Sequence, residues 1–343
     1  IATLVIFWLI TISQFGGTKN TAKIAKVGFF VGIVATGVIL FLLGIIYIAQ
    51  GNPIKVSFGA GAWMPDFTKI NTLVVFVSFI LAYAGVESSA SHVKDMDNPG
   101  KNYPKAILIL VAATILLDTL GGVTVAATIP QNQLSLDTGV IQAYSYLIHH
   151  FGGSEWLVRF IAVVICLGVI AEIAAWVVGP STAMLEAAEN GLLPKQLAKV
   201  NQHNVPINIV LIQGIIVSIW AVILTLGGGG ANLSFFVAMA LTVCIYLVAY
   251  VLLFISYIKL VKDKDNLTRT YHIPGGKNVK ITVAGVGLLV SIFSFFISFF
   301  PPNDIGSGKG GTYLTILIIS WLIIVIIPFV IYKFVGEKAN GIK

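Results

Sequence analysis

The sequence is poor in charged residues and in cysteine, and each shortage excludes a class of protein. Asp, Glu, Lys and Arg make up only 10% of the 343 residues, whereas a soluble domain carries roughly 25%. The two cysteines, Cys166 and Cys244, both lie inside apolar stretches, so they predict neither a disulfide nor a metal site. Hydrophobic residues make up 57% of the chain, which is more than a soluble core of this size can hide. The composition therefore predicts an integral membrane protein.

Nine apolar stretches have the length expected of membrane-spanning helices, although the first is short. A spanning helix needs about 20 mostly apolar residues, whereas the strands of a membrane barrel are shorter and alternate in polarity. The sequence therefore predicts an all-α integral membrane protein with a single transmembrane domain over residues 1–343. The first stretch opens the chain without a polar leader, so we expect an N-terminally truncated chain. The stretches cover 1–13, 24–49, 70–91, 104–129, 157–184, 206–226, 232–259, 281–300 and 312–334.

Basic residues are distributed unevenly between the loops. Alternate loops hold 17 of the 21 lysines and arginines when the flanking helix ends are included. Lys55, Lys69 and Lys309 fall in the other loops. Because basic residues concentrate on the cytoplasmic side of membrane proteins, the richer loops and the C-terminus are predicted to be cytoplasmic. This topology also accounts for the net charge of +7, so we expect no nucleic-acid partner. The richer set comprises 14–23, 92–103, 185–205, 260–280 and the tail after 334.

Small residues and an acid interrupt the apolar character of stretch 70–91. Ala82, Tyr83, Ala84 and Gly85 precede Glu87. Such a run can unwind inside the membrane and offer free backbone N–H and C=O groups to a ligand. The alternative is close packing of the small residues against another helix.

Polar side chains also lie deep in two later stretches. Glu172 and Trp176 are four residues apart and share one helix face. An acid at this depth is costly unless it faces water, a partner or a substrate, so we interpret Glu172 as part of a pathway; the alternative is a hydrogen bond to a neighbouring helix. Thr242, Tyr246 and Tyr250 share a face of another helix, which indicates either a polar, aromatic-lined cavity or packing with satisfied hydroxyls.

The remaining polar features indicate no chemistry of their own. Asp118 lies near the middle of stretch 104–129, and both a structural and a proton-linked role stay open for it. The glycine run 227–230 is not followed by the Gly-Lys-Ser/Thr sequence of a phosphate-binding loop. Because no nucleophile can be paired with a base, we expect neither an enzyme nor a cofactor or metal site.

Several strings resemble the amino acid–polyamine–organocation (APC) transporters. Residues 83–90 and 98–104 resemble the sixth helix of that superfamily and the loop that follows it. Residues 179–181, 190–194 and 205–206 resemble the end of its eighth helix. The strings 171–176, 269–277 and 299–305 are similar to the bacterial antiporters that exchange glutamate for γ-aminobutyrate.

The resemblance implies a bundle of twelve helices with two inverted five-helix repeats and broken first and sixth helices. This chain would hold helices 4–12, in a bacterial inner membrane, as a multi-pass protein. The implied function is exchange of extracellular glutamate for intracellular γ-aminobutyrate by alternating access, linked to acid resistance through a cytoplasmic glutamate decarboxylase. Another amino acid exchanger or a proton-coupled permease of the same superfamily is the first alternative, and a membrane sensor or channel is a distant one.

The resemblance also implies a substrate site. In the family the unwound part of the sixth helix binds the substrate backbone, an aromatic residue of the eighth helix packs on the substrate, and a tyrosine of the tenth helix lines the path. Leu81 stands where the arginine/agmatine exchangers have tryptophan, which argues against a substrate of the arginine type. The glutamate/γ-aminobutyrate antiporters have a C-terminal tail that closes the transport path. Only nine residues follow the last stretch here, so the sequence does not decide whether this protein has such a tail. With Tyr250, which the helical spacing adds, the expected substrate-binding residues are Ala82, Tyr83, Ala84, Gly85, Glu87, Glu172, Trp176, Tyr246 and Tyr250.

Overall fold

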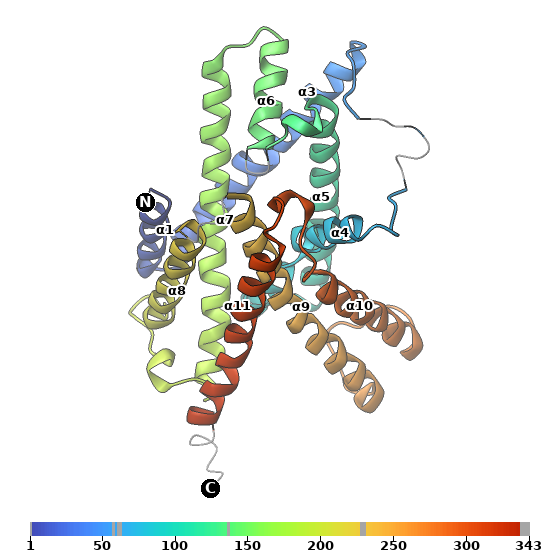
Figure 1. Ribbon diagram of the computed structural model, residues 1–343. Helices are drawn as coiled ribbons and strands as arrows, with labels where there is room; N and C mark the ends of the chain where they lie inside the picture. Colours follow the sequence, from blue (N-terminus) through green and yellow to red (C-terminus); the bar gives the residue numbers. More distant parts are fainter. Residues whose placement is uncertain (1, 57–58, 60–63, 136–137, 227–230, 337–343) are drawn as a thin grey trace. The chain divides into compact units, whose positions relative to one another are not determined.

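The computed structural model describes residues 2–56, 59, 64–135, 138–226 and 231–336, and every regular element in these ranges is a helix (Figure 1). The chain divides into two compact units. The first comprises Ile1–Met64, Ile109–Asn190 and Pro194–Ser218. The second comprises Pro65–Leu108, Gly191–Leu193 and Ile219–Lys343.

The described residues contain eight helices that are long and apolar enough to cross a membrane. Each coincides with one of the predicted stretches from 24–49 onward. The first predicted stretch is also helical, as a shorter apolar segment over Ala2–Gly16. The eight spans are Thr21–Ala49, Ile70–Ala90, Pro99–Thr128, Glu155–Glu189, Ile207–Leu226, Leu233–Lys264, Lys277–Ile297 and Gly310–Phe334.

The helices differ from the predicted stretches at several ends, and one short helix was not predicted. Helix α5, Pro99–Thr128, begins five residues earlier than expected, since a proline suits the first turn of a helix, where its missing N–H costs nothing. Helix α4, Ile70–Tyr83, ends well before residue 91. Helix α6, Gly139–His150, was not predicted because it is too short to span. Short helices are η1 Gln14–Gly16, η5 Gln131–Gln133, η6 Lys195–Ala198, η7 Asn303–Ile305 and η8 Tyr332–Gly336.

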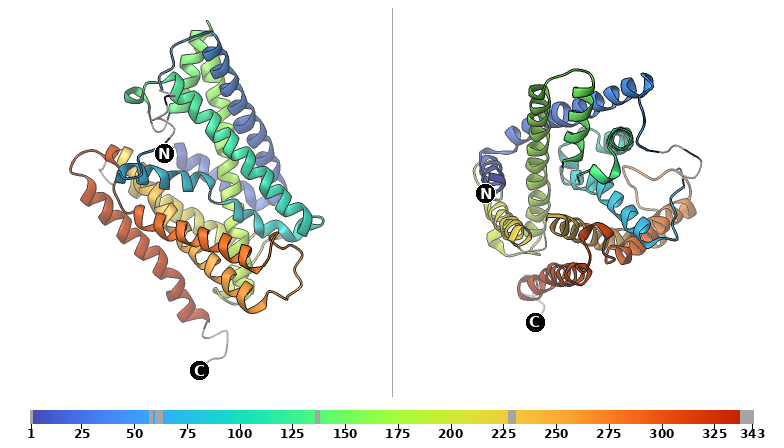
Figure 2. Two further views of the ribbon diagram at one scale, coloured as in Figure 1. Left: turned by 90° about the vertical axis from the view of Figure 1, so that its right-hand side faces the viewer. Right: turned by 45° about the horizontal axis from the view of Figure 1, so that its top comes forward.

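Helix α7, Glu155–Glu189, is the central element of the first unit. It contacts α1 (Ala2–Ser13), α2 (Thr18–Val27), the π-helix η2 (Gly28–Ala35) and α6. Figures 1 and 2 show α6 running beside one end of α7. Helix α3, Thr36–Ala49, continues the span of η2 and packs on α6.

Glycines allow η2 and α7 to cross at very short range. A Cβ added to Gly32 would lie 2.4 Å from the Gly168 nitrogen, and one added to Gly28 would lie 2.2 Å from the Ala171 Cβ. In a bilayer, burying apolar side chains between helices gives little free energy, because lipid tails are equally apolar. Helices therefore associate through close packing of small residues. The crossing therefore fixes the part of α7 that also carries Glu172.

The second unit is built around α9, Ala231–Lys264. Helices α4, α10 (Lys277–Ile297) and α11 (Gly310–Ile331) all pack against it. Figure 2 shows α10 running alongside α9. On the α11 side, Tyr313 is buried and donates its hydroxyl to the Ser298 carbonyl at 2.9 Å, which ties α11 to the end of α10.

We expect Gly32→Ala to destabilise the protein. The new methyl group has no room against the Gly168 backbone, and forcing an extra carbon into a packed contact costs about 1–3 kcal/mol. Gly121→Ala is the matched control, because it replaces a glycine of α5 whose added Cβ meets nothing within 4 Å, and alanine favours a helix by about 1 kcal/mol. Thermal unfolding in detergent measures both. A Gly32→Ala protein that melts no lower than the Gly121→Ala protein would contradict the close crossing.

Candidate functional site

The helix of the third apolar stretch is interrupted at Gly85. Helix α4 ends at Tyr83, Ala84 is extended, and Gly85 has φ 98° and ψ −7°. This left-handed conformation is accessible to glycine at little cost. A 3₁₀ helix, η4, then runs from Val86 to Asp95. The predicted interruption is thereby confirmed.

Three groups meet at the interruption. The Gly85 N–H is donated both to Glu87 Oε2 at 3.1 Å and to Tyr250 Oη at 3.2 Å. The Tyr250 hydroxyl in turn donates to the same Glu87 oxygen at 2.8 Å. One oxygen of the Glu87 carboxylate therefore accepts two hydrogen bonds. The Gly85 N–H, which has no acceptor within a regular helix, is bonded to two side chains instead. We call Gly85, Glu87 and Tyr250 the Gly85 cluster.

Packing between α4 and α9 brings the Gly85 cluster together. Val243, Leu247 and Tyr250 recur along one face of α9 at helical spacing. This face meets Val74 and Val77 of α4 in a common apolar core. The core holds the end of α4 against α9, so that Gly85, two residues after the helix end, comes within reach of the Tyr250 hydroxyl.

Tyr246 extends the Gly85 cluster by one turn of α9. Its ring centroid lies 6.0 Å from that of Tyr250, with the two rings tilted by 53°. Thr242, which shares this face in the sequence, returns its hydroxyl to the Ala238 carbonyl of its own helix at 2.8 Å.

Glu172 and Trp176 lie in the first unit, on α7, which continues through Pro180 without a break. Both side chains are exposed, while the neighbouring Ala171 and Ala174 are buried. Exposure of the Glu172 carboxylate does not fit the alternative of a buried acid held by another helix.

Gln213 of α8, Ile207–Leu226, supports Trp176 and was missed by the sequence analysis. Pro180 has no N–H to give to the carbonyl four residues earlier, which is that of Trp176. The Gln213 side-chain amide donates to this carbonyl at 3.3 Å. A lone amide inside an apolar span was the available signal, but the sequence does not show that it faces residue 176.

The predicted site residues fall into two groups. Glu172 and Trp176 lie in the first unit, and the others lie in the second. Ala82 and Tyr83 close α4, Ala84 and Gly85 form the interruption, and Glu87 and Tyr250 complete the Gly85 cluster beside Tyr246. Their binding roles, like those of Glu172 and Trp176, stay predictions. Among the described residues, no three His, Cys, Asp or Glu side chains gather as a metal site requires.

Residues 1–327 match the family model described as amino acid permease. The chain is 53% identical over 341 residues to a glutamate/γ-aminobutyrate antiporter of Lactococcus lactis subsp. lactis, covering 99% of this chain and 68% of the relative. The corresponding antiporter of L. lactis subsp. cremoris has the same identity and coverage. A probable agmatine/putrescine antiporter of L. lactis is 23% identical over 303 residues, covering 87% of this chain and 63% of that protein.

We expect Tyr250→Phe to loosen the interruption without unfolding the protein. The ring keeps its place against α4, but Glu87 loses a donor and the Gly85 N–H loses an acceptor. Loss of a hydrogen bond worth about 1 kcal/mol corresponds to roughly fivefold faster opening, which hydrogen–deuterium exchange of the peptide around residue 85 measures. Tyr257→Phe, on the same helix but outside the cluster, is the control. Equal exchange in the two variants would show that the cluster does not hold the interruption.

Proposed function

Since the chain belongs to the amino acid permease family, we propose that it exchanges extracellular glutamate for intracellular γ-aminobutyrate by alternating access. The 53% identity to glutamate/γ-aminobutyrate antiporters over 99% of the chain is the observation that carries this proposal. The chain is a multi-pass membrane protein. We further propose that it lies in a bacterial inner membrane with its C-terminus in the cytoplasm, and that it forms helices 4–12 of an inverted-repeat bundle.

We propose that the Gly85 cluster recognises the charged groups of the substrate. Both substrates carry a carboxylate and an ammonium, which require hydrogen-bond donors and acceptors respectively. Glu87 holds the Gly85 N–H and the Tyr250 hydroxyl, and these are the donors that a substrate carboxylate needs. We therefore propose that a substrate carboxylate takes the place of Glu87 on these donors, while the released Glu87 attracts the ammonium.

Glu172, Trp176 and Tyr246 are proposed to select and cover the substrate. An exposed acid inside an apolar span is costly in lipid, so it is retained where it meets water or a cation. Trp176 offers a flat apolar surface one helical turn away, and Gln213 holds its backbone in place. Tyr246 offers a second aromatic surface beside the Gly85 cluster.

The proposed exchange fits a role in acid resistance. Decarboxylation of glutamate to γ-aminobutyrate consumes one proton in the cytoplasm. Import of glutamate and export of γ-aminobutyrate would therefore raise the internal pH with each cycle. The proposed functional partner is a cytoplasmic glutamate decarboxylase.

Counterflow in liposomes tests the exchange. Full-length protein is reconstituted into liposomes loaded with γ-aminobutyrate, and labelled glutamate is added outside. We expect uptake of labelled glutamate that requires the internal amino acid, because an exchanger returns its site across the membrane only with a substrate bound. Uptake into empty liposomes driven by a proton gradient would instead identify a proton-coupled permease.

We expect Glu172→Gln to weaken binding of γ-aminobutyrate. The amide keeps the size and the hydrogen-bonding capacity of the acid, but it cannot attract an ammonium as a carboxylate does. Loss of one hydrogen bond to a charged group costs about 1.5–3 kcal/mol, or roughly tenfold to a hundredfold in affinity. Asp118→Asn, also in a span of the first unit, is the matched control. Unchanged affinity for both substrates in the Glu172→Gln protein would remove Glu172 from the substrate site.

A further inference from the structure

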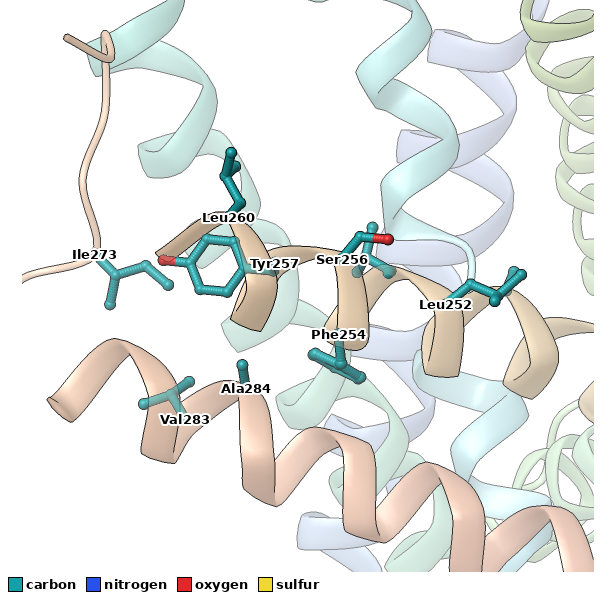
Figure 3. A pocket seen from close by; sticks show the side chains of 10 residues that line it. Leu252, Phe254, Ser256, Tyr257, Leu260, Ile273, Val283 and Ala284 are labelled. Atoms are coloured by element: carbon teal, nitrogen blue, oxygen red, sulfur yellow. The ribbon is translucent and has the colours of Figure 1, made fainter. Parts of the chain in front are cut away.

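An apolar groove runs between α9 and α10 in the second unit. Its volume is about 780 Å³, within the range of known ligand sites. Figure 3 shows Phe254 extending from α9 toward α10, with Val283 and Ala284 on the opposite wall. Tyr257 points toward Ile273, which comes from the loop that connects the two helices.

A glycine lets the two walls of the groove approach closely at Phe254. A Cβ added to Gly287 of α10 would lie 2.5 Å from the Phe254 ring, so the ring occupies the space of a missing side chain. The groove is also lined by exposed apolar side chains such as Leu253 and Val283. The groove is therefore open along its length to whatever surrounds the protein.

The length of the groove matches one leaflet of a bilayer. Its lining on α9 extends from Ala249 to Leu260, which is about 16 Å at 1.5 Å per residue. The hydrocarbon core of a bilayer is about 30 Å thick, so the groove covers about half of it. Tyr257 lies near the loop end, where tyrosine is favoured at the border between hydrocarbon and headgroups.

The loop end of the groove carries an excess of positive charge. Residues 259–280 contain six lysines and arginines and two aspartates, a difference of four charges. Lys280 is buried and pairs with Asp265 at 2.9 Å. The Lys280 ammonium, with Arg269 and Lys277 farther off, holds the pKa of the Asp265 carboxyl below its usual value.

Within the part of the chain that the structure describes, Arg269 and Lys277 form no ion pair with a carboxylate. Lys277 Nζ donates to the Lys262 carbonyl at 2.9 Å, and the Arg269 guanidinium donates to the Lys264 carbonyl at 3.0 Å. A carbonyl orients these side chains but does not neutralise their charge. Arg269 and Lys277 also flank Ile273 in the sequence, so they belong to the loop that closes this end of the groove.

We propose that the groove between α9 and α10 binds an anionic phospholipid. One acyl chain lies along Leu253, Phe254 and Val283, and the phosphate and anionic headgroup meet Lys262, Arg269 and Lys277. The basic loop is on the side predicted to be cytoplasmic, where anionic lipids attract basic residues at membrane surfaces. This proposal does not depend on the transported substrate.

Lipid binding is measured directly by native mass spectrometry of the full-length protein. Phosphatidylglycerol and phosphatidylcholine with identical acyl chains compete for the protein in detergent. We expect a preference of at least tenfold for phosphatidylglycerol at one site, since each basic residue near an anionic surface contributes about 1 kcal/mol, or about fivefold. The combined replacements Lys262→Gln, Arg269→Gln and Lys277→Gln should abolish the preference. The charge-conserving set Lys262→Arg, Arg269→Lys and Lys277→Arg should retain it.

A matched pair of substitutions tests the groove itself. Val283 and Val286 both lie on α10 and are 52% and 56% exposed, but only Val283 is among the residues that line the groove. Val283→Trp should displace the bound phosphatidylglycerol, and Val286→Trp should not; melting temperatures confirm that both proteins are folded. Retention of the lipid by Val283→Trp, or equal binding of the two lipids by the unaltered protein, would overturn the proposal. A stable dimer that Val283→Trp dissociates would also overturn it, because a second copy would then occupy the groove.

Discussion

Backbone groups inside a bilayer have no water to bind, and the structure depends on how this chain satisfies them where its helices are irregular. At Gly85 the helical pattern stops, and Glu87 and Tyr250 receive the N–H that is released. At Trp176 the carbonyl loses its helical donor because Pro180 lacks one, and Gln213 supplies another. In both places a side chain from a helix distant in the sequence forms a hydrogen bond to a backbone group of a predicted substrate-binding segment. Glu87, Tyr250 and Gln213 therefore stabilise the backbone of these spans, in addition to any role in transport.

The two units organise these segments by different kinds of packing. In the first unit, glycines on η2 and α7 let the backbones approach, and the crossing ends one residue before Glu172. In the second unit, valine and leucine side chains of α4 and α9 interlock, and the same face of α9 continues into Tyr250. Glu172 and Tyr250 thus each lie directly beside a close packing contact between helices.

Much of the fold could be predicted from the sequence, because a long apolar segment in lipid forms a helix to satisfy its own backbone hydrogen bonds. Stretch 206–226 differs from its helix by a single residue. The interruption at Gly85 could also be anticipated, since small residues next to an acid are unusual in a span. Helix α6 escaped prediction because it is too short for the length criterion.

The pairings within the site could not be predicted in the same way. Glu87 and Tyr250 are 163 residues apart, and Trp176 and Gln213 are 37 apart. Periodicity assigns each residue to a helix face, but it does not say which two faces meet. The resemblance to a transporter family indicated Glu87 and Trp176, and helical spacing indicated Tyr250, but neither indicated Gln213, whose partner is a backbone atom.

The interruption at Gly85 also places electric dipoles where an unbroken helix would have none. The carbonyl end of α4 carries a partial negative charge, and the first N–H groups of η4 carry a partial positive one. These charges belong to the peptide groups themselves, which do not titrate. A zwitterion that binds there meets two opposite poles whose strength is the same in acid and in neutral surroundings. The polarity of the backbone at the interruption therefore stays constant when the pH changes.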